Sequence, residues 1–217
     1  MIDLRTIQTR LGNGANNHII TTSPGTDTSN WLIEPMKPKQ ELYYRLDPKD
    51  LIIEVGGPWD DFAKRNNGFR ILAGQIEGQN LFSHITGDST QMLMDVLLAK
   101  VRRHQNPVTH PYRCDSPTLK RFMEMTIEPD TYGFLNLRHR LLKSEPIASW
   151  AVVDAVVPGR TGQSIVIRCS MCNSVRMGKE WVELETATQQ GLTIEQGVMR
   201  VAYGVCSNCR STYTSEG

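Results

Sequence analysis

The chain has 217 residues, enough for one domain of ordinary size together with a smaller one. Apolar residues make up 39% and charged residues 22%, which is the composition of a globular protein with a sizeable core. The 24 basic side chains nearly balance the 23 acidic ones, and the formal net charge is +1. This balance excludes a general electrostatic attraction to nucleic acid or to anionic membranes.

Two further absences concern location. No run approaches about 18 consecutive apolar residues, the length that a transmembrane helix needs. The N-terminal sequence MIDLRTIQTRLGNG has an early acidic residue and lacks the apolar core of a secretory signal. We therefore expect a cytoplasmic protein with no membrane partner, whose cysteines stay reduced.

Residues 1–40 are expected to be an N-terminal extension. Residues 1–11 carry a sparse apolar stripe that favours a short helix. Residues 12–30 are dense in Gly, Asn, Ser and Thr, which is typical of a loosely attached loop.

Regular structure is expected from Glu41 onward. The apolar runs 42–47 and 51–55 are separated by the turn sequence Pro-Lys-Asp, and this predicts a β-hairpin. Residues 58–66 begin with proline and carry apolar side chains three and four residues apart, which predicts a short amphipathic helix. A long helix is expected to begin at Asp88 as its N-cap and to end near Gln105.

Three strands are expected after the long helix, at 108–114, 119–129 and 133–142. The second alternates regularly and places Met123 and Met125 on one face. The order of two strands, short helices, a long helix and three strands predicts an α+β fold, with a five-stranded antiparallel sheet covered by helices on one face. This domain is expected to span 41–146.

A connecting segment is predicted at 147–164, made of an apolar strand at 149–157 and a linker at 158–164 that contains PGRTGQS. The remaining residues, 165–217, form the predicted metal-binding module. Strands around EWVELE and VMRVAYG and a short helix at TATQQ are expected within it. Trp181 is expected to pack the small core of this module.

Four of the five cysteines form two pairs, each with two residues between its members: Cys169 and Cys172, then Cys206 and Cys209. A turn of this spacing lets two sulfur atoms converge on one ion, and two such turns complete the tetrahedral shell of a structural Zn²⁺ site. Iron in place of zinc, and a thiol pair that is oxidised to a disulfide, are the alternatives. Cys114 is expected to be a buried, inert thiol.

The segments YYRLDPKDLIIEV, PWDDFAKRN and ILAGQIEGQNLFSHITGD, with the long helix and the three closing strands, resemble a PAS sensor domain over about 42–145. YRCDSPTLKRFMEMTIEP is similar to a bacterial PAS subgroup in which a paired-cysteine, zinc-ribbon-like tail follows the domain. The resemblance implies signal reception, a homodimer formed through this domain and a protein partner. It also implies an internal cavity.

Some PAS proteins hold haem through a histidine, so the cavity hypothesis needs candidate residues. His84 and His139 are preferred over His104, and Met123 and Met125 are candidates for the cavity wall. A histidine beside leucines on a strand is, however, typical of a hydrogen-bonded core residue.

The sequence therefore predicts a regulatory protein in which a PAS-like domain senses a ligand or partner and a structural zinc module mediates contacts. Two alternatives stay open: a nucleic-acid-binding regulator that reads through the zinc module, and a thiol-based redox switch. No Ser/His/Asp arrangement, phosphate-binding glycine loop or persuasive carboxylate pair is present, and we do not expect an enzyme.

Overall fold

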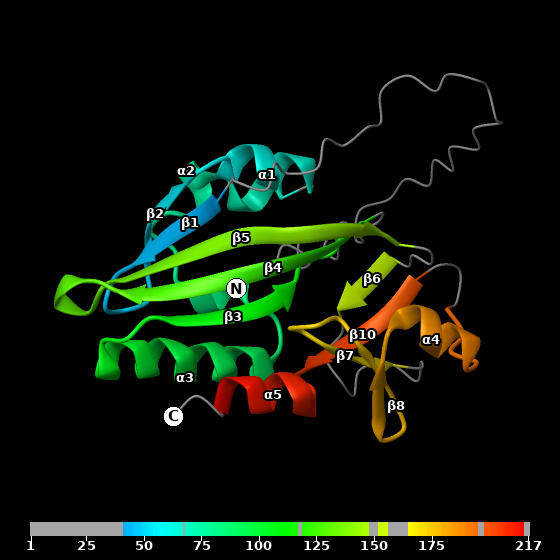
Figure 1. Cartoon of the computed structure of the whole chain (residues 1–217). Coiled ribbons are helices and arrows are strands. Elements are labelled where there is room, and N and C mark those ends of the chain that lie inside the picture. The colour runs from blue at the N-terminus through cyan, green and yellow to red at the C-terminus, as the bar shows by residue number, and fades with distance from the viewer. Residues whose placement is uncertain are drawn as a thin grey trace, which may run out of the picture.

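The computed structural model describes residues 41–66, 68–116, 119–147, 152–155, 165–194 and 198–214. Within them the chain forms two sheets of five strands each (Figure 1). We call residues 41–147 the N-terminal domain, and 152–155 together with 165–214 the C-terminal module. The expected helix at 1–11, the loop at 12–30 and the linker at 158–164 lie outside the described residues.

The sheet of the N-terminal domain is antiparallel throughout, with the order β2-β1-β5-β4-β3. Its strands are β1 (Glu41–Leu46), β2 (Ile52–Gly56), β3 (Val108–Arg113), β4 (Leu119–Pro129) and β5 (Leu135–Pro146). The predicted five-stranded antiparallel sheet is confirmed. The last strand starts later than predicted because residues 131–133 form a 3-10 turn, in which Tyr132 has a φ of 57°.

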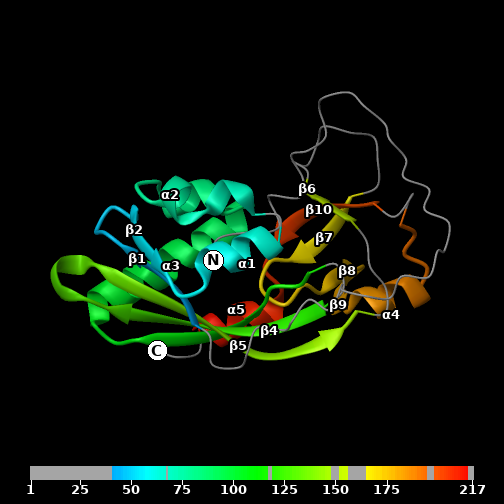
Figure 2. The same ribbon diagram turned by 90° about the horizontal axis from the view of Figure 1, so that it is seen from above.

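The helical segments gather on one face of this sheet, as Figure 2 shows from above. They are α1 (Trp59–Arg65), η2 (Phe69–Ile71), α2 (Ala73–Ile76), η3 (Leu81–His84) and α3 (Asp88–His104). Among the described residues, no helix combines the length and the apolar character that crossing a membrane requires.

The expected N-cap of the long helix is wrong. Gly87 occupies that position, with a φ of 93° and no capping side chain, and Asp88 lies inside the first turn. A positive φ is costly for residues with a Cβ, and a Cβ on Gly87 would also lie 3.0 Å from Tyr203 Cβ. Glycine therefore suits both the positive φ and the close approach of Tyr203 at this position. Asp88 still places a negative charge at the positive end of the helix dipole.

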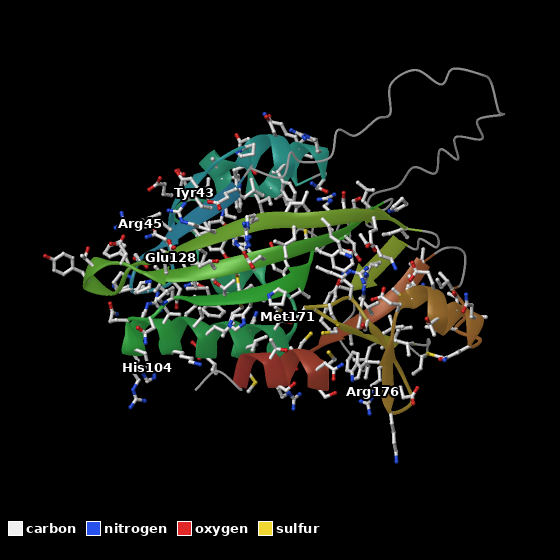
Figure 3. The ribbon with its side chains drawn as sticks, in the orientation of Figure 1. Tyr43, Arg45, His104, Glu128, Met171 and Arg176 are labelled. Atoms are coloured by element: carbon white, nitrogen blue, oxygen red, sulfur yellow. The ribbon has the colours of Figure 1, made fainter. Side chains whose placement is uncertain are left out.

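Alternation along β4 separates a buried face from a charged one. Met123, Met125 and Ile127 are at most 1% exposed and face the helical layer. On the opposite face Glu128 lies 3.1 Å from Arg138 Nε, and Figure 3 labels this glutamate on the outer surface of the sheet. A fully buried side chain of this size contributes about 1.5–3 kcal/mol, so the alternation fixes which face the helices cover.

The second sheet has the order β6-β10-β7-β8-β9. Its elements are β6 (Val152–Ala155), β7 (Val166–Cys169), β8 (Val175–Met177), β9 (Glu180–Val182), α4 (Leu184–Gln189), β10 (Val198–Gly204) and α5 (Ser207–Thr214). Strand β10 runs parallel to both β6 and β7, whereas β7, β8 and β9 are antiparallel. Part of the predicted connecting segment therefore belongs to this sheet.

The C-terminal module has two apolar regions. Among the described residues its own buried cluster is small: Val175, Ala187, Met199 and Val201. The end that carries the cysteines instead joins the buried cluster of the N-terminal domain. Trp181 packs against this larger cluster, so the prediction that it fills the core of the module is wrong.

Opposite charges line the seam between the two units. Arg113 Nη1 lies 2.7 Å from each carboxylate oxygen of Glu183. Lys120 Nζ lies 2.7 Å from Glu185 Oε1. In the reverse sense, Arg168 of the module faces Asp115 of the domain at 3.8 Å. The seam is therefore held by polar contacts as well as by apolar packing.

Candidate metal centre

The second sheet brings the two cysteine pairs to one place. Cys169 is the last residue of β7, and Cys172 follows in the turn towards β8. Cys206 comes directly after β10, and Cys209 lies in the first turns of α5. Because β7 and β10 are parallel neighbours, with Gly204 paired to Cys169, both strands deliver their cysteines at the same edge.

The four sulfur atoms lie within 4.8 Å of one another, and the Cys172 and Cys206 sulfurs are 3.8 Å apart. A tetrahedral site with zinc–sulfur bonds of about 2.3 Å has sulfur–sulfur edges of about 3.8 Å. A disulfide would need sulfur atoms about 2.05 Å apart. The cysteines thus lie close together, as their spacing predicts, and could hold one metal ion. Zinc and iron both accept four thiolates.

Backbone groups support negative charge on the sulfurs. The N–H of Cys206 points at Cys169 Sγ at 3.4 Å, and the N–H of Cys209 points at Cys206 Sγ at 3.3 Å. Asn173, at a φ of 65°, turns the chain after the first pair, and its N–H donates to the Cys169 carbonyl at 3.0 Å. Asparagine tolerates this left-handed conformation better than most residues.

The thiols also influence one another. Hydrogen bonds from the Cys172 and Cys209 thiols lower the pKa of Cys169 to about 3. The hydrogen bonds of Cys209 with Cys169 and Cys172, together with burial and their negative charges, raise the pKa of Cys209. One thiolate is thus stabilised by its neighbours, while further thiolates repel one another. A bound divalent cation removes that repulsion, which is the chemistry of a metal site.

The candidate cavity residues lie in the N-terminal domain. His139 is buried on the inner face of β5, and its Nδ1 lies 2.8 Å from the Tyr112 hydroxyl. Its ring stacks on Tyr44 with centroids 5.3 Å apart. Burial lowers the pKa of His139 to about 3, which keeps the ring uncharged. Within the described part of the chain, its Nε2 has no hydrogen-bond partner.

Met123 and Met125 share the buried face with His139, and Met125 lies directly opposite it in the sheet register. His84 comes from η3 and is half-buried, and burial lowers its pKa. His104 lies at the exposed end of α3 (Figure 3). The structure therefore joins His139 to the methionines on one face, and the haem hypothesis stays a prediction.

The fifth cysteine differs from its expected environment. Cys114 is only partly buried, packs against the large cluster, and donates its N–H to the Arg121 carbonyl at 3.0 Å. The predicted buried thiol is therefore only partly buried.

A buried charged group beside the metal centre escaped the sequence interpretation. Asp115 lies between Arg113, at 2.5 Å, and Arg168, at 3.8 Å, and all three side chains are at most 9% exposed. Burial alone would lower the pKa of Arg113, but Asp115 and Glu183 outweigh this effect and raise it. The sequence offers a weak signal, because Arg168 directly precedes Cys169, but no spacing rule pairs it with Asp115.

Among the comparisons with known proteins, solved structures give distant likenesses. No family model matches the chain, and no curated protein matches it. A solved domain of an HTR-like protein from Haloarcula marismortui aligns with 14% sequence identity and a TM-score of 0.35. The alignment covers 48% of this chain and 98% of that one. At this TM-score the likeness carries no conclusion about function.

Proposed function

We propose that this chain is a cytoplasmic regulatory protein without catalytic activity. Its N-terminal domain is a PAS-like sensor of a ligand or partner, and its C-terminal module holds a structural Zn²⁺ and mediates contacts. The observation that carries the proposal is the convergence of four cysteine sulfurs within 4.8 Å, at the junction with the N-terminal domain.

The sensor assignment has its own support. The resemblance implies a hairpin, short helices, a long helix and three closing strands, and the N-terminal domain has these elements in this order. The buried His139 has an Nε2 with no hydrogen-bond partner in the described residues. A buried polar atom of this kind is a group that a ligand or an ordered water satisfies.

The closed shell of the metal site favours a structural role. Four thiolates fill the tetrahedron, whereas a catalytic zinc site keeps one position for water or substrate. Cys169 and Cys206 are at most 3% exposed, which restricts the access of a substrate. Zn²⁺ would supply stabilisation here, and Cys169, Cys172, Cys206 and Cys209 would hold it.

A second copy of the chain is the proposed partner, with α3 as the contact. Met92 and Val96 are 69% and 61% exposed, and with Ala99 they follow a spacing of four and three residues along one face. This is the spacing of a coiled-coil seam. The helix begins with Asp88 and ends with Arg103 and His104, so an antiparallel copy brings opposite charges together.

Self-association can be measured by analytical ultracentrifugation of the full chain. Val96→Glu should weaken dimer formation at least tenfold, by about 1.4 kcal/mol or more, because it places a charge on the apolar face of α3. Ile53→Glu, at another exposed apolar position, is the matched control. A monomeric wild-type chain, or equal effects of the two variants, would remove α3 as the contact.

The principal test of the proposed function is the metal content of protein purified without added metal. Elemental analysis should give one zinc per chain, and the visible spectrum should show no band from haem, flavin or iron–thiolate. Stoichiometric iron with a visible absorption band would replace the zinc assignment. A chain with no stoichiometric metal would remove the module from the proposal.

Nucleic-acid binding by the module is tested by the salt dependence of binding. Arg168, one basic residue beside the site, is already engaged by Asp115 and by the Asn173 carbonyl at 3.3 Å. Affinity for DNA or RNA that falls steeply with salt concentration would favour the alternative, a nucleic-acid-binding regulator. A lack of binding at low salt would exclude it.

A further inference from the structure

The loop of the first cysteine pair enters the N-terminal domain. Met171 lies between the two cysteines of this pair and is 0% exposed. It belongs to the same buried cluster as Leu97 of α3 and Met123 of β4. Figure 3 places Met171 between the first sheet and the module. One metal-site loop thus supplies a side chain to the core of the other unit.

The same loop also occupies the edge of the first sheet. Strand β3 is the last strand of that sheet, and its final residue, Arg113, pairs with Phe122 of β4. The N–H of Arg113 donates to the Met171 carbonyl at 2.7 Å. An edge strand has backbone groups without a strand partner, and here the metal-site loop satisfies one of them.

Three buried charged side chains, Arg113, Asp115 and Arg168, lie where the metal-site loop meets the β3 edge. Asp115 follows β3 and accepts hydrogen bonds from Arg113 at 3.1 and 2.5 Å. Arg168 lies beside it, and its Nε donates to the Asn173 carbonyl in the turn that closes the first cysteine pair. One of the two cationic neighbours of Asp115 thus lies on β7, and β7 ends in Cys169, a ligand of the proposed metal site.

We infer that the metal ion is an effector of the N-terminal domain: its binding to the four cysteines orders the β3 edge through Met171 and the Arg113–Asp115–Arg168 set. The inference rests on the proposed metal site and deepens it, because it assigns the cation a role outside the module. A thiophilic divalent cation holds four sulfurs at fixed separations and so fixes the loop between Cys169 and Asn173. Without it, no common ligand holds the four sulfurs together and the loop is released.

Release of the loop has consequences inside the N-terminal domain. Met171 leaves a core position, the Arg113 N–H loses its acceptor, and Asp115 loses the positioned Arg168. The second and third changes fall on Arg113 and Asp115, within residues 111–116, while β1 and β2 lie at the other end of the strand order. Coupling between binding sites is reciprocal. A ligand or partner that shifts β3 therefore changes the metal affinity by the same factor.

Hydrogen exchange on the full chain tests this coupling. Amide exchange would be measured by mass spectrometry on the metal-bound chain, on the chain treated with a chelator and a reductant, and after Zn²⁺ is added back. We expect exchange of residues 111–116 to rise at least about tenfold without metal and to return with Zn²⁺, while β1 and β2 change little. Unchanged exchange at 111–116, with faster exchange at 169–174, would overturn the inference.

Two variants separate the coupling from metal binding itself. Met171→Ala keeps all four cysteines, so it should retain one metal per chain while exchange at 111–116 in the metal-bound state rises about threefold or more. Met177→Ala is the matched control, because Met177 packs on the module's own cluster. If the amides of residues 111–116 exchange at the wild-type rate in both metal-bound variants, the proposed coupling through Met171 is wrong. A chain without metal would instead refute the proposed function.

Discussion

The two units of this protein differ in the size of the apolar core that each one buries. The N-terminal domain buries apolar side chains from both a sheet and a layer of helices, with Tyr44, Leu97 and Met125 almost fully excluded from solvent. Among the described residues, the C-terminal module buries four side chains in a core of its own. We therefore expect apolar burial to be sufficient for the first unit, whereas the second should depend on its cysteines and on its neighbour.

The short strands of the C-terminal module also limit the core that it can build. Strands β8 and β9 have three residues each, and β7 has four. Small units bury too small a fraction of their surface to be stable by apolar packing alone, and a structural metal is a common remedy. The comparison predicts that metal loss disrupts the module first and most strongly.

The largest effect is expected from Cys169→Ser. The change removes one ligand, and structural zinc sites contribute about 10–16 kcal/mol of apparent binding free energy in small zinc domains. Metal content should fall from one per chain to below about 0.1, and the module should lose its protection from proteolysis. Elemental analysis and limited proteolysis measure the two effects.

Cys114→Ser is the matched control for that variant. Cys114 lies outside the cluster of four sulfurs, so metal content and protection should stay at their wild-type values. A variant at Cys169 that keeps its metal and its protection would contradict the view that the metal orders the module.

The next largest effect is expected at the seam. Asp115→Asn removes the negative charge between Arg113 and Arg168, whose side chains are 8% and 9% exposed. Breaking a buried ion pair from one side costs roughly 3–5 kcal/mol, because charge is left uncompensated. The free energy of unfolding in urea should fall by about this amount.

Glu145→Gln is its control. The pair of Lys143 and Glu145 is 59% and 48% exposed, and a surface ion pair contributes at most about 1 kcal/mol. If both substitutions cost less than about 1 kcal/mol, the seam would be no more than a surface contact.

Local rules predict the N-terminal domain well. The strict alternation along β4 predicts which methionines are buried, and the turn sequence at 48–50 predicts the first hairpin. The cysteine spacing predicts that four sulfurs meet, since that chemistry depends on short turns. In each case the information lies within a few neighbouring residues.

The remaining features depend on contacts between distant segments. The parallel pairing of β10 with both β6 and β7 has no local sequence signal. The burial of Met171 in a cluster shared with the other unit, and the position of Asp115 between two arginines, also arise only once the units meet. The wrong N-cap has a different cause: a glycine at positive φ displaced a residue of high capping preference.

A smaller effect is expected from a cavity in the N-terminal domain. Leu97→Ala removes a side chain that is 1% exposed, and such changes cost about 2–5 kcal/mol. Calorimetry should show destabilisation with the metal content unchanged, because this core is held by apolar packing. Met92→Ala on the same helix, at a position 69% exposed, should cost less than about 0.5 kcal/mol. Loss of metal in the Leu97 variant would contradict the proposed difference, in which apolar packing holds the N-terminal domain and the metal holds the module.

The smallest effect is the pH dependence of the N-terminal domain. The pKa of His139 is about 3 in the folded chain and about 6.5 when exposed, so the unfolded chain binds the proton more readily. The contribution is complete above about pH 6.5 and is lost as the pH falls towards 3, by up to about 1.4 kcal/mol per unit. His139→Phe should reduce this slope in urea unfolding between pH 7 and 5. Met125→Leu alters the residue opposite His139 without removing a titrating group, so it should keep the slope. Equal slopes in the wild type and in His139→Phe would mean that the ring is not the buried, neutral group on which the cavity hypothesis depends.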